Sequence, residues 1–211
     1  MPRPRVPLLD RPRIRAAALA AVDRDGLAGL SMRRLAADLG VQAPSLYSHY
    51  RTKDDLLQDV AEDVMAAVDT SGFAEDWVTG LRGWARSYRA ALAAHPNLVP
   101  VLAAGPARRP TALLHADAVH GGLVGAGWPP RHATMIGAST KYLVLGAAMS
   151  SFSRGFEDDV QVYVDRYPHL GQAHRLREHA DEIDADSFEL AVDAFIAGLT
   201  ALHARVARAA P

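Results

Sequence analysis

The apolar residues of this chain recur every three or four positions along most of its length, which is the period of an amphipathic helix. Strand-like alternation is scarce, and Ala, Leu, Arg, Asp and Glu dominate. Gly and Pro divide the pattern into segments, and residues 154–182 are irregular and acidic. We therefore predict an all-α protein. Its expected helices cover residues 11–24, 31–39, 44–50, 54–68, 75–94, 98–103, 110–124, 131–153 and 185–208.

Capping residues mark the ends of several of these segments. Ser31 and Thr52 stand where a side-chain oxygen can accept a hydrogen bond from a first-turn N–H group. Pro44 stands in the first turn of a short helix, where proline is tolerated. Gly40 follows the second helix, where a left-handed residue commonly ends a helix. These signals predict two short helices joined by a tight turn between residues 31 and 50.

The last predicted helix carries a regular apolar stripe with spacings of 4, 3, 4, 3 and 4, which give a period of 3.5 residues. The stripe consists of Phe188, Val192, Phe195, Leu199, Leu202 and Val206. This stripe indicates either a helix packed within its own domain or a helix shared with a second subunit in a four-helix bundle. The helix at 131–153, with several small residues, is the expected mate. The residues expected at a dimer interface are Leu145, Met149, Phe188, Val192, Phe195, Leu199 and Leu202.

The net charge of −1 conceals an asymmetry along the chain. Residues 1–53 hold ten Lys/Arg and four Asp/Glu, a net charge of +6, whereas residues 54–211 have a net charge of −7. A basic head on an acidic body indicates a polyanionic partner at one end, although basic N-terminal tails are common in any case. Cysteine is absent, which excludes disulfides, thiolate zinc sites and cysteine nucleophiles.

Neither a membrane anchor nor a secretion signal is expected. No window holds 18 consecutive apolar residues, and the basic N-terminus lacks the apolar core of a signal peptide. We therefore expect a cytoplasmic protein with no membrane partner.

The chemistry-bearing segment runs from Leu30 to Lys53 and reads LSMRRLAADLGVQAPSLYSHYRTK. Helix, glycine-containing turn and short helix are the parts of a helix-turn-helix, whose second helix reads the major groove of DNA. Small polar side chains on that helix fit a groove, and the basic residues beside it neutralise phosphates. The alternative is an exposed helical hairpin that binds no nucleic acid. The candidate DNA-contacting residues are Ser31, Arg33, Arg34, Gln42, Ala43, Pro44, Ser45, Tyr47, Ser48, His49 and Lys53.

Other motifs give weaker signals. The glycine-rich run at 121–127 follows no strand and is expected to be a helix end rather than a dinucleotide loop. His115 and His120 are five residues apart, as are His174 and His179, and this spacing does not place two ligands on one helix face. We expect no metal site, no cofactor and no catalytic group. An enzyme and a pure protein-interaction module remain the alternative classes.

The segment that begins at Leu30 resembles the DNA-binding head of the tetracycline-repressor (TetR) family of transcriptional regulators. The matching residues include Leu35, Ala36, Gly40, Tyr47 and Lys53, and the resemblance covers about residues 11–60. It implies a DNA-binding domain at 1–60 and a ligand-binding and dimerisation domain at 61–211. It also implies a homodimer that a small-molecule effector, here unknown, releases from a palindromic operator on double-stranded DNA. Most members of this family are repressors.

The remainder of the chain is similar to the regulatory half of the tetracycline repressors proper, and by that resemblance it holds an effector pocket. The candidate pocket residues are Trp84, Tyr88, Leu102, His115, Val119, Met135 and Tyr142, each of which could equally be a core residue. The sequence departs from those repressors where the drug is held. Where those repressors have a polar residue that contacts the drug, this chain has Trp84 at or near the position. Where they have the histidine that ligates magnesium, this chain has Leu102 nearby. This difference argues against a tetracycline–magnesium complex as the effector.

Overall fold

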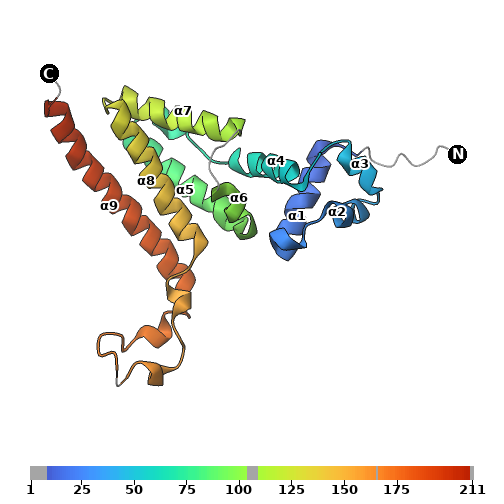
Figure 1. Cartoon of the computed structure of the whole chain (residues 1–211). Coiled ribbons are helices and arrows are strands. Elements are labelled where there is room, and N and C mark those ends of the chain that lie inside the picture. Colours follow the sequence, from blue (N-terminus) through green and yellow to red (C-terminus); the bar gives the residue numbers. More distant parts are fainter. Residues whose placement is uncertain (1–8, 104–108, 165, 210–211) are drawn as a thin grey trace. The chain divides into compact units, whose positions relative to one another are not determined.

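The computed structural model describes residues 9–103, 109–164 and 166–209, and within these ranges every regular element is helical (Figure 1). The predicted all-α fold class is confirmed. The main helices are α1 (Arg11–Gly29), α2 (Met32–Asp38), α3 (Ala43–Tyr47), α4 (Lys53–Met65), α5 (Trp77–Ala94), α6 (Val99–Ala103), α7 (Pro110–Gly125), α8 (Pro130–Met149) and α9 (Ala180–Ala209).

The chain divides into two compact units. The first unit comprises Met1–Val68 and Ala91–Leu114, and the second comprises Asp69–Ala90 and His115–Pro211. The first unit therefore contains α1 to α4 together with α6, the end of α5 and the start of α7. The domain boundary that we predict at residue 60 stays a prediction.

The core of the first unit lies between α1, α2, α3 and α4. Ile14 on α1, Leu46 on α3 and Leu56 on α4 are completely buried, and Leu35 on α2 is 1% exposed. These residues recur at helical spacing on one face of each element, as the sequence pattern predicts. Burial of one apolar face on every helix holds the short α2 and α3 in place.

Three helix ends in the first half of the chain are set by local geometry. α1 breaks at Gly26, whose φ of 71° and ψ of 175° are not helical, close to its predicted end. α4 ends at Met65, so its predicted extension to residue 68 was wrong, although Val68 is buried. α5 begins at Trp77 because the Asp76 carboxylate accepts the N–H groups of Val78 and Thr79, at 2.8 and 2.9 Å.

The second unit is a bundle in which α8 and α9 lie side by side (Figure 1). The Arg86 guanidinium on α5 pairs with Glu189 on α9 at 2.6 Å, and Arg82 pairs with Asp193 one turn further along. The glycine-rich run is a helix end, as predicted. α7 ends at Gly125, Gly127 has a φ of 90°, and the N–H of Trp128 donates to the Leu123 carbonyl at 3.1 Å.

The segment between α8 and α9 is irregular but has its own small core. The Tyr163 hydroxyl accepts the Glu157 N–H at 2.8 Å and donates to the Glu157 carbonyl at 3.1 Å. α8 stops at Met149 rather than at residue 153, because Ser150 adopts an extended backbone. α9 begins at Ala180, five residues before its predicted start, with two acidic residues in its first turn, where the helix dipole favours negative charge.

Candidate DNA interface and effector region

The turn between α2 and α3 is held by backbone hydrogen bonds of the Schellman type. Ser31 caps α2 by accepting the Arg34 N–H at 3.2 Å. At the other end, the N–H groups of Gly40 and Val41 donate to the Ala37 and Ala36 carbonyls at 3.0 and 2.9 Å. Gly40 has a φ of 69°, a conformation that costs an L-residue energy. The predicted cap and the predicted glycine stop are both confirmed.

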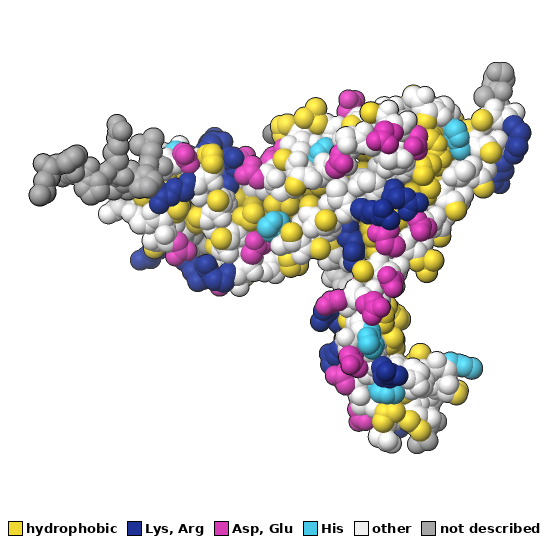
Figure 2. Space-filling model, turned by 180° about the vertical axis from the view of Figure 1, so that it is seen from behind, with side chains coloured by type: hydrophobic (Ala, Val, Ile, Leu, Met, Phe, Trp, Pro, Cys, Tyr) yellow, Lys and Arg dark blue, Asp and Glu magenta, His cyan; other side chains and the backbone are white. Residues whose placement is uncertain are grey.

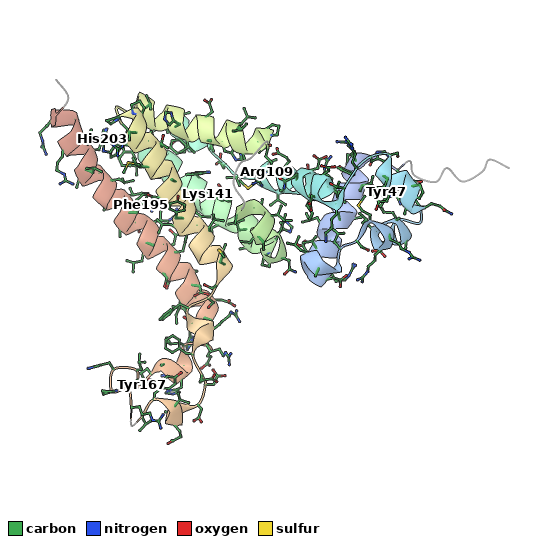
Figure 3. All side chains as sticks on the ribbon, viewed as in Figure 1. Tyr47, Arg109, Lys141, Tyr167, Phe195 and His203 are labelled. Atoms are coloured by element: carbon green, nitrogen blue, oxygen red, sulfur yellow. The ribbon has the colours of Figure 1, made fainter. Side chains whose placement is uncertain are left out.

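The α3 helix buries one face and exposes the other. Leu46 and Tyr50 are buried, whereas Tyr47 is 52% exposed and projects from α3 (Figure 3). Among the candidate DNA contacts, Ala43 and His49 are half-buried. The other members on the turn and α3 are exposed, namely Gln42, Pro44, Ser45, Tyr47 and Ser48. This face offers small polar groups around one aromatic ring.

The basic candidates have different surroundings. Several Lys and Arg side chains gather on this unit (Figure 2), and Arg33 is exposed. Arg34 is also exposed, but it pairs with Asp25 at 2.9 Å. Lys53 is half-buried, and its Nζ donates to the Leu27 carbonyl at 2.6 Å. Lys53 therefore stabilises the C-terminal end of α1 in the free protein, where a positive charge is favoured.

A polar network ties α1 to α4 next to α3. The Tyr50 hydroxyl donates to Asp59 at 3.0 Å, and Arg11 donates to Asp59 at 3.3 Å and to the His49 carbonyl at 2.9 Å. Burial raises the pKa of Tyr50 further above its ordinary value, which already keeps this hydroxyl protonated and a donor at neutral pH. One turn further along α1, Arg15 pairs with Asp63. The network therefore fixes His49 and Tyr50, which lie two and three residues after the end of α3.

The predicted effector residues lie in different environments. Trp84 and Tyr88 on α5 are 7% and 4% exposed, with ring centroids 6.3 Å apart, and Val119 on α7 is also buried. The Trp84 Nε1 atom is buried and has no hydrogen-bond partner among the described residues. His115 is half-buried. The second unit therefore holds a buried aromatic pair with one free donor.

The remaining pocket candidates differ from that pair. Met135 and Tyr142 on α8 are 53% and 71% exposed in the single chain. Leu102 is buried, but it belongs to the first unit. The prediction that these residues line one pocket stays a prediction.

Some of the predicted dimer residues are already buried by packing within the single chain. Phe188, Val192 and Leu199 are buried in the single chain, whereas Leu145, Phe195 and Leu202 are half-buried and Met149 is exposed. The period of 3.5 residues therefore marks mainly the side of α9 that faces its own unit. The opposite side is exposed, and it is apolar at four positions spaced 4, 3 and 4 apart. They are Leu190, Ala194, Ala197 and Ala201.

By length and composition alone, α9 could also cross a membrane, since Ala180–Arg208 contains a window of high mean hydropathy. In this structure 17% of that window is buried. The ion pairs of Glu189 and Asp193 with α5 place charges midway along one side of this helix. A bilayer disfavours charges at such a position. An apolar helix with one uncovered face is also what a subunit interface requires.

Sequence reasoning missed several polar contacts around α1 and α4. Asn97 and His95 contact the end of α1, and the Glu62 carboxylate accepts the Thr111 N–H at 2.9 Å. No sequence spacing links these partners, because each pair is far apart along the chain. Among the described residues, no group of three or more His, Asp and Glu side chains is placed to hold a metal ion.

Comparison with known proteins agrees with this architecture. The model of bacterial regulatory proteins of the tetR family matches residues 14–60, and the model of tetracyclin repressor-like C-terminal domains matches residues 72–203. An HTH-type transcriptional regulator from Saccharopolyspora erythraea is 30% identical over 183 residues, which are 85% of this chain and 72% of that relative.

Solved structures are similar over almost the whole chain. A possible TetR family transcriptional regulator from Streptomyces coelicolor has a TM-score of 0.76 at 30% identity, covering 92% of this chain and 100% of that chain. ActR from the same organism, in complex with (S)-DNPA, has a TM-score of 0.73 at 29% identity, covering 92% and 98%. This chain therefore belongs to the TetR family and is a ligand-responsive, DNA-binding regulator of transcription.

Proposed function

We propose that this regulator represses transcription by binding a palindromic operator as a homodimer, with the exposed face of α3 in the major groove of each half-site. The observation that carries this proposal is the division of α3 into a buried face with Leu46 and an exposed face with Tyr47. Gln42 and Ser45 offer donors and acceptors of a size that reaches base edges. The Ser48 hydroxyl donates to the Ser45 carbonyl at 2.8 Å and offers an acceptor. The Tyr47 hydroxyl is suited to a phosphate or sugar contact.

The basic residues contribute to this contact unequally. Arg33 is exposed and is the strongest candidate for a phosphate contact. Arg34 has to share its charge with Asp25, at 2.9 Å, which reduces the attraction that it adds. Lys53 already donates to the Leu27 carbonyl, so it can neutralise a phosphate only from this fixed position. We therefore expect fewer neutralised phosphates per head than the count of basic residues suggests.

We further propose that two copies pair through the exposed sides of α8 and α9. On α9 this surface contains Leu190, which is 72% exposed, together with the small residues that follow it at helical spacing. On α8 it contains Tyr142 and Met149, each 71% exposed. Large exposed apolar side chains between small ones allow close packing of four helices across a two-fold axis. Phe188, Val192 and Leu199 would support this interface from beneath.

The effector is proposed to be a planar aromatic molecule with a hydrogen-bond acceptor. Trp84 and Tyr88 provide buried ring surfaces, and the unpartnered Trp84 Nε1 can donate to a carbonyl or phenolic oxygen. ActR is described in complex with actinorhodin. Actinorhodin is a fused-ring compound rich in such oxygens, which supports this class of effector here.

A gel-shift titration of the purified protein against the DNA that flanks its own gene, at several salt concentrations, tests the proposal. Tight, sequence-specific binding with a steep salt dependence is the expected result, because phosphate neutralisation releases counterions. A folded dimer that binds no flanking fragment at any salt concentration would contradict the proposed repression of a neighbouring operator.

The effector part of the proposal has a separate test. Actinorhodin is added to the complex of the protein with its DNA fragment, and release of the DNA is measured. Trp84→Phe removes the indole donor and keeps an aromatic ring, so it is expected to weaken the response to an active compound and leave operator affinity unchanged. An equal response in wild type and variant would show that the Trp84 indole does not donate to the effector.

A further inference from the structure

The C-terminal end of α1 is held by side chains from outside the helix. The last four carbonyls of a helix lack partners within it, and the break at Gly26 puts Val22 and Asp23 in that position. The Asn97 amide nitrogen donates to both carbonyls, at 3.0 Å each. Asn97 is the single asparagine of the chain. One side-chain amide therefore caps a broken helix end that is 74 residues away in sequence.

His95 contacts the same turn of α1. Its Nδ1 lies 3.1 and 3.0 Å from the two carboxylate oxygens of Asp23. Between His95 and Asn97 stands Pro96, which restricts the backbone of the short 3₁₀ turn Pro96–Leu98. α6 follows this turn directly. The start of α6 is therefore fixed to α1 through two side chains on either side of a rigid residue.

The other end of the same segment is attached to α4. The Thr111 N–H, in the first turn of α7, donates to Glu62 of α4 at 2.9 Å. At the same end of α1, Lys53 of α4 donates to the Leu27 carbonyl at 2.6 Å. Residues 91–114 belong to the same compact unit as the helix-turn-helix. They follow the part of α5 that carries the proposed effector residues Trp84 and Tyr88.

We propose that Asn97 is a positioning residue for DNA binding: by holding the Val22 and Asp23 carbonyls, its amide makes a displacement of residues 95–103 move α1 and the helix-turn-helix packed on it. This inference rests on the proposed function, since it requires that effector binding in the second unit shifts this segment. An apolar contact could slide, whereas two hydrogen bonds from one amide define a single position. The linkage is reciprocal, so operator binding must also change the surroundings of the Asn97 amide.

A single asparagine makes this linkage directly observable. The full chain is labelled with ¹⁵N at asparagine side chains only, which gives one pair of amide resonances from Asn97. In the free protein the pair is expected to be protected from solvent exchange, and the shortest flanking fragment that the wild type retains is expected to shift it. An unprotected pair would overturn the cap. A protected pair that the operator leaves unchanged would mean that Asn97 only caps α1, and it would overturn the proposal that Asn97 couples residues 95–103 to DNA binding.

Substitution gives an independent test. Asn97→Asp keeps the shape but puts a carboxylate against two carbonyl oxygens, and operator affinity is expected to fall roughly tenfold, within the usual range of coupling between sites. The slope of affinity against salt concentration should stay the same, because no phosphate contact is lost. Gln58→Glu makes the same charge change at an exposed position on α4, and its effect should stay below about threefold.

Asn97→Ala serves as the second variant, since it removes the donors without adding a charge and remains informative if Asn97→Asp does not fold. Affinities of both Asn97 variants equal to that of Gln58→Glu would overturn the proposal. Failure of the wild type to bind any fragment is a different result. It contradicts the proposed function, and the amide pair of the free protein still decides whether the cap exists.

Discussion

The helix-turn-helix and α9 solve the problem of holding a helix in opposite ways. α3 has five residues and is fixed by the hydrogen-bonded turn around Gly40 and by one deeply buried residue, Leu46. α9 has 30 residues, packs one apolar side within its own unit and leaves an apolar side with Leu190 exposed. A short helix becomes rigid through its ends, whereas a long one depends on what covers its faces. The first is complete in one chain, whereas we propose that a second copy completes the second.

The two sides of α9 provide the largest expected contrast. Leu199 is 7% exposed, so Leu199→Asp buries an unpaired charge and should lower the free energy of unfolding by about 3–5 kcal/mol. Chemical denaturation followed by far-UV circular dichroism measures this loss. A folded Leu199→Asp protein with wild-type stability, but monomeric, would mean that Leu199 faces a second subunit rather than its own core.

Leu190→Asp is the matched change on the exposed side. Because Leu190 is 72% exposed, the variant should fold, yet its dimer should dissociate about 100-fold more readily if this side is the interface. Analytical ultracentrifugation over a dilution series measures the dissociation constant. An unchanged dimer would place the interface elsewhere, and unfolding would show that the side is already covered in the chain.

The exposed face of α3 can be tested without disturbing its fixed ends. Tyr47→Ala removes a side chain that is 52% exposed, so the free energy of unfolding should change by less than about 0.5 kcal/mol. Operator affinity should fall at least about tenfold, equivalent to about 1.4 kcal/mol. Fluorescence anisotropy with a labelled operator measures the affinity. Wild-type affinity in a folded variant would remove Tyr47 from the set of DNA contacts.

These contrasts also explain how far the sequence predicts the molecule. Ser31 and Gly40 form hydrogen bonds with residues only three positions away, so a single stretch of sequence is enough to predict their roles. The stripe that contains Leu199 predicts a packed helix face, but period alone does not identify the element that covers it. The contact of Asn97 with α1 is invisible in the sequence, because a hydrogen bond between distant residues leaves no periodic signal.

The smallest expected effects come from adding one methyl group, either in the turn before α3 or in the middle of a long helix. Gly40→Ala forces an alanine into a left-handed conformation although nothing lies within 4 Å of the added Cβ, so it should destabilise the protein by about 1 kcal/mol. Gly83 in the middle of α5 also leaves its added Cβ without neighbours within 4 Å, but its backbone is helical. Gly83→Ala should therefore stabilise the protein by about 0.5–1 kcal/mol.

Denaturation of both variants at one protein concentration measures these changes of opposite sign. If Gly40→Ala were neutral, the turn would tolerate a different backbone, and α3 would be held by Leu46 and Tyr50 rather than by its turn. Gly40→Ala should in addition weaken operator binding beyond its effect on stability, because a relaxed turn changes the angle at which α3 leaves α2. Gly83→Ala provides the control for that measurement, since a change of stability alone leaves the affinity of the folded protein unaltered.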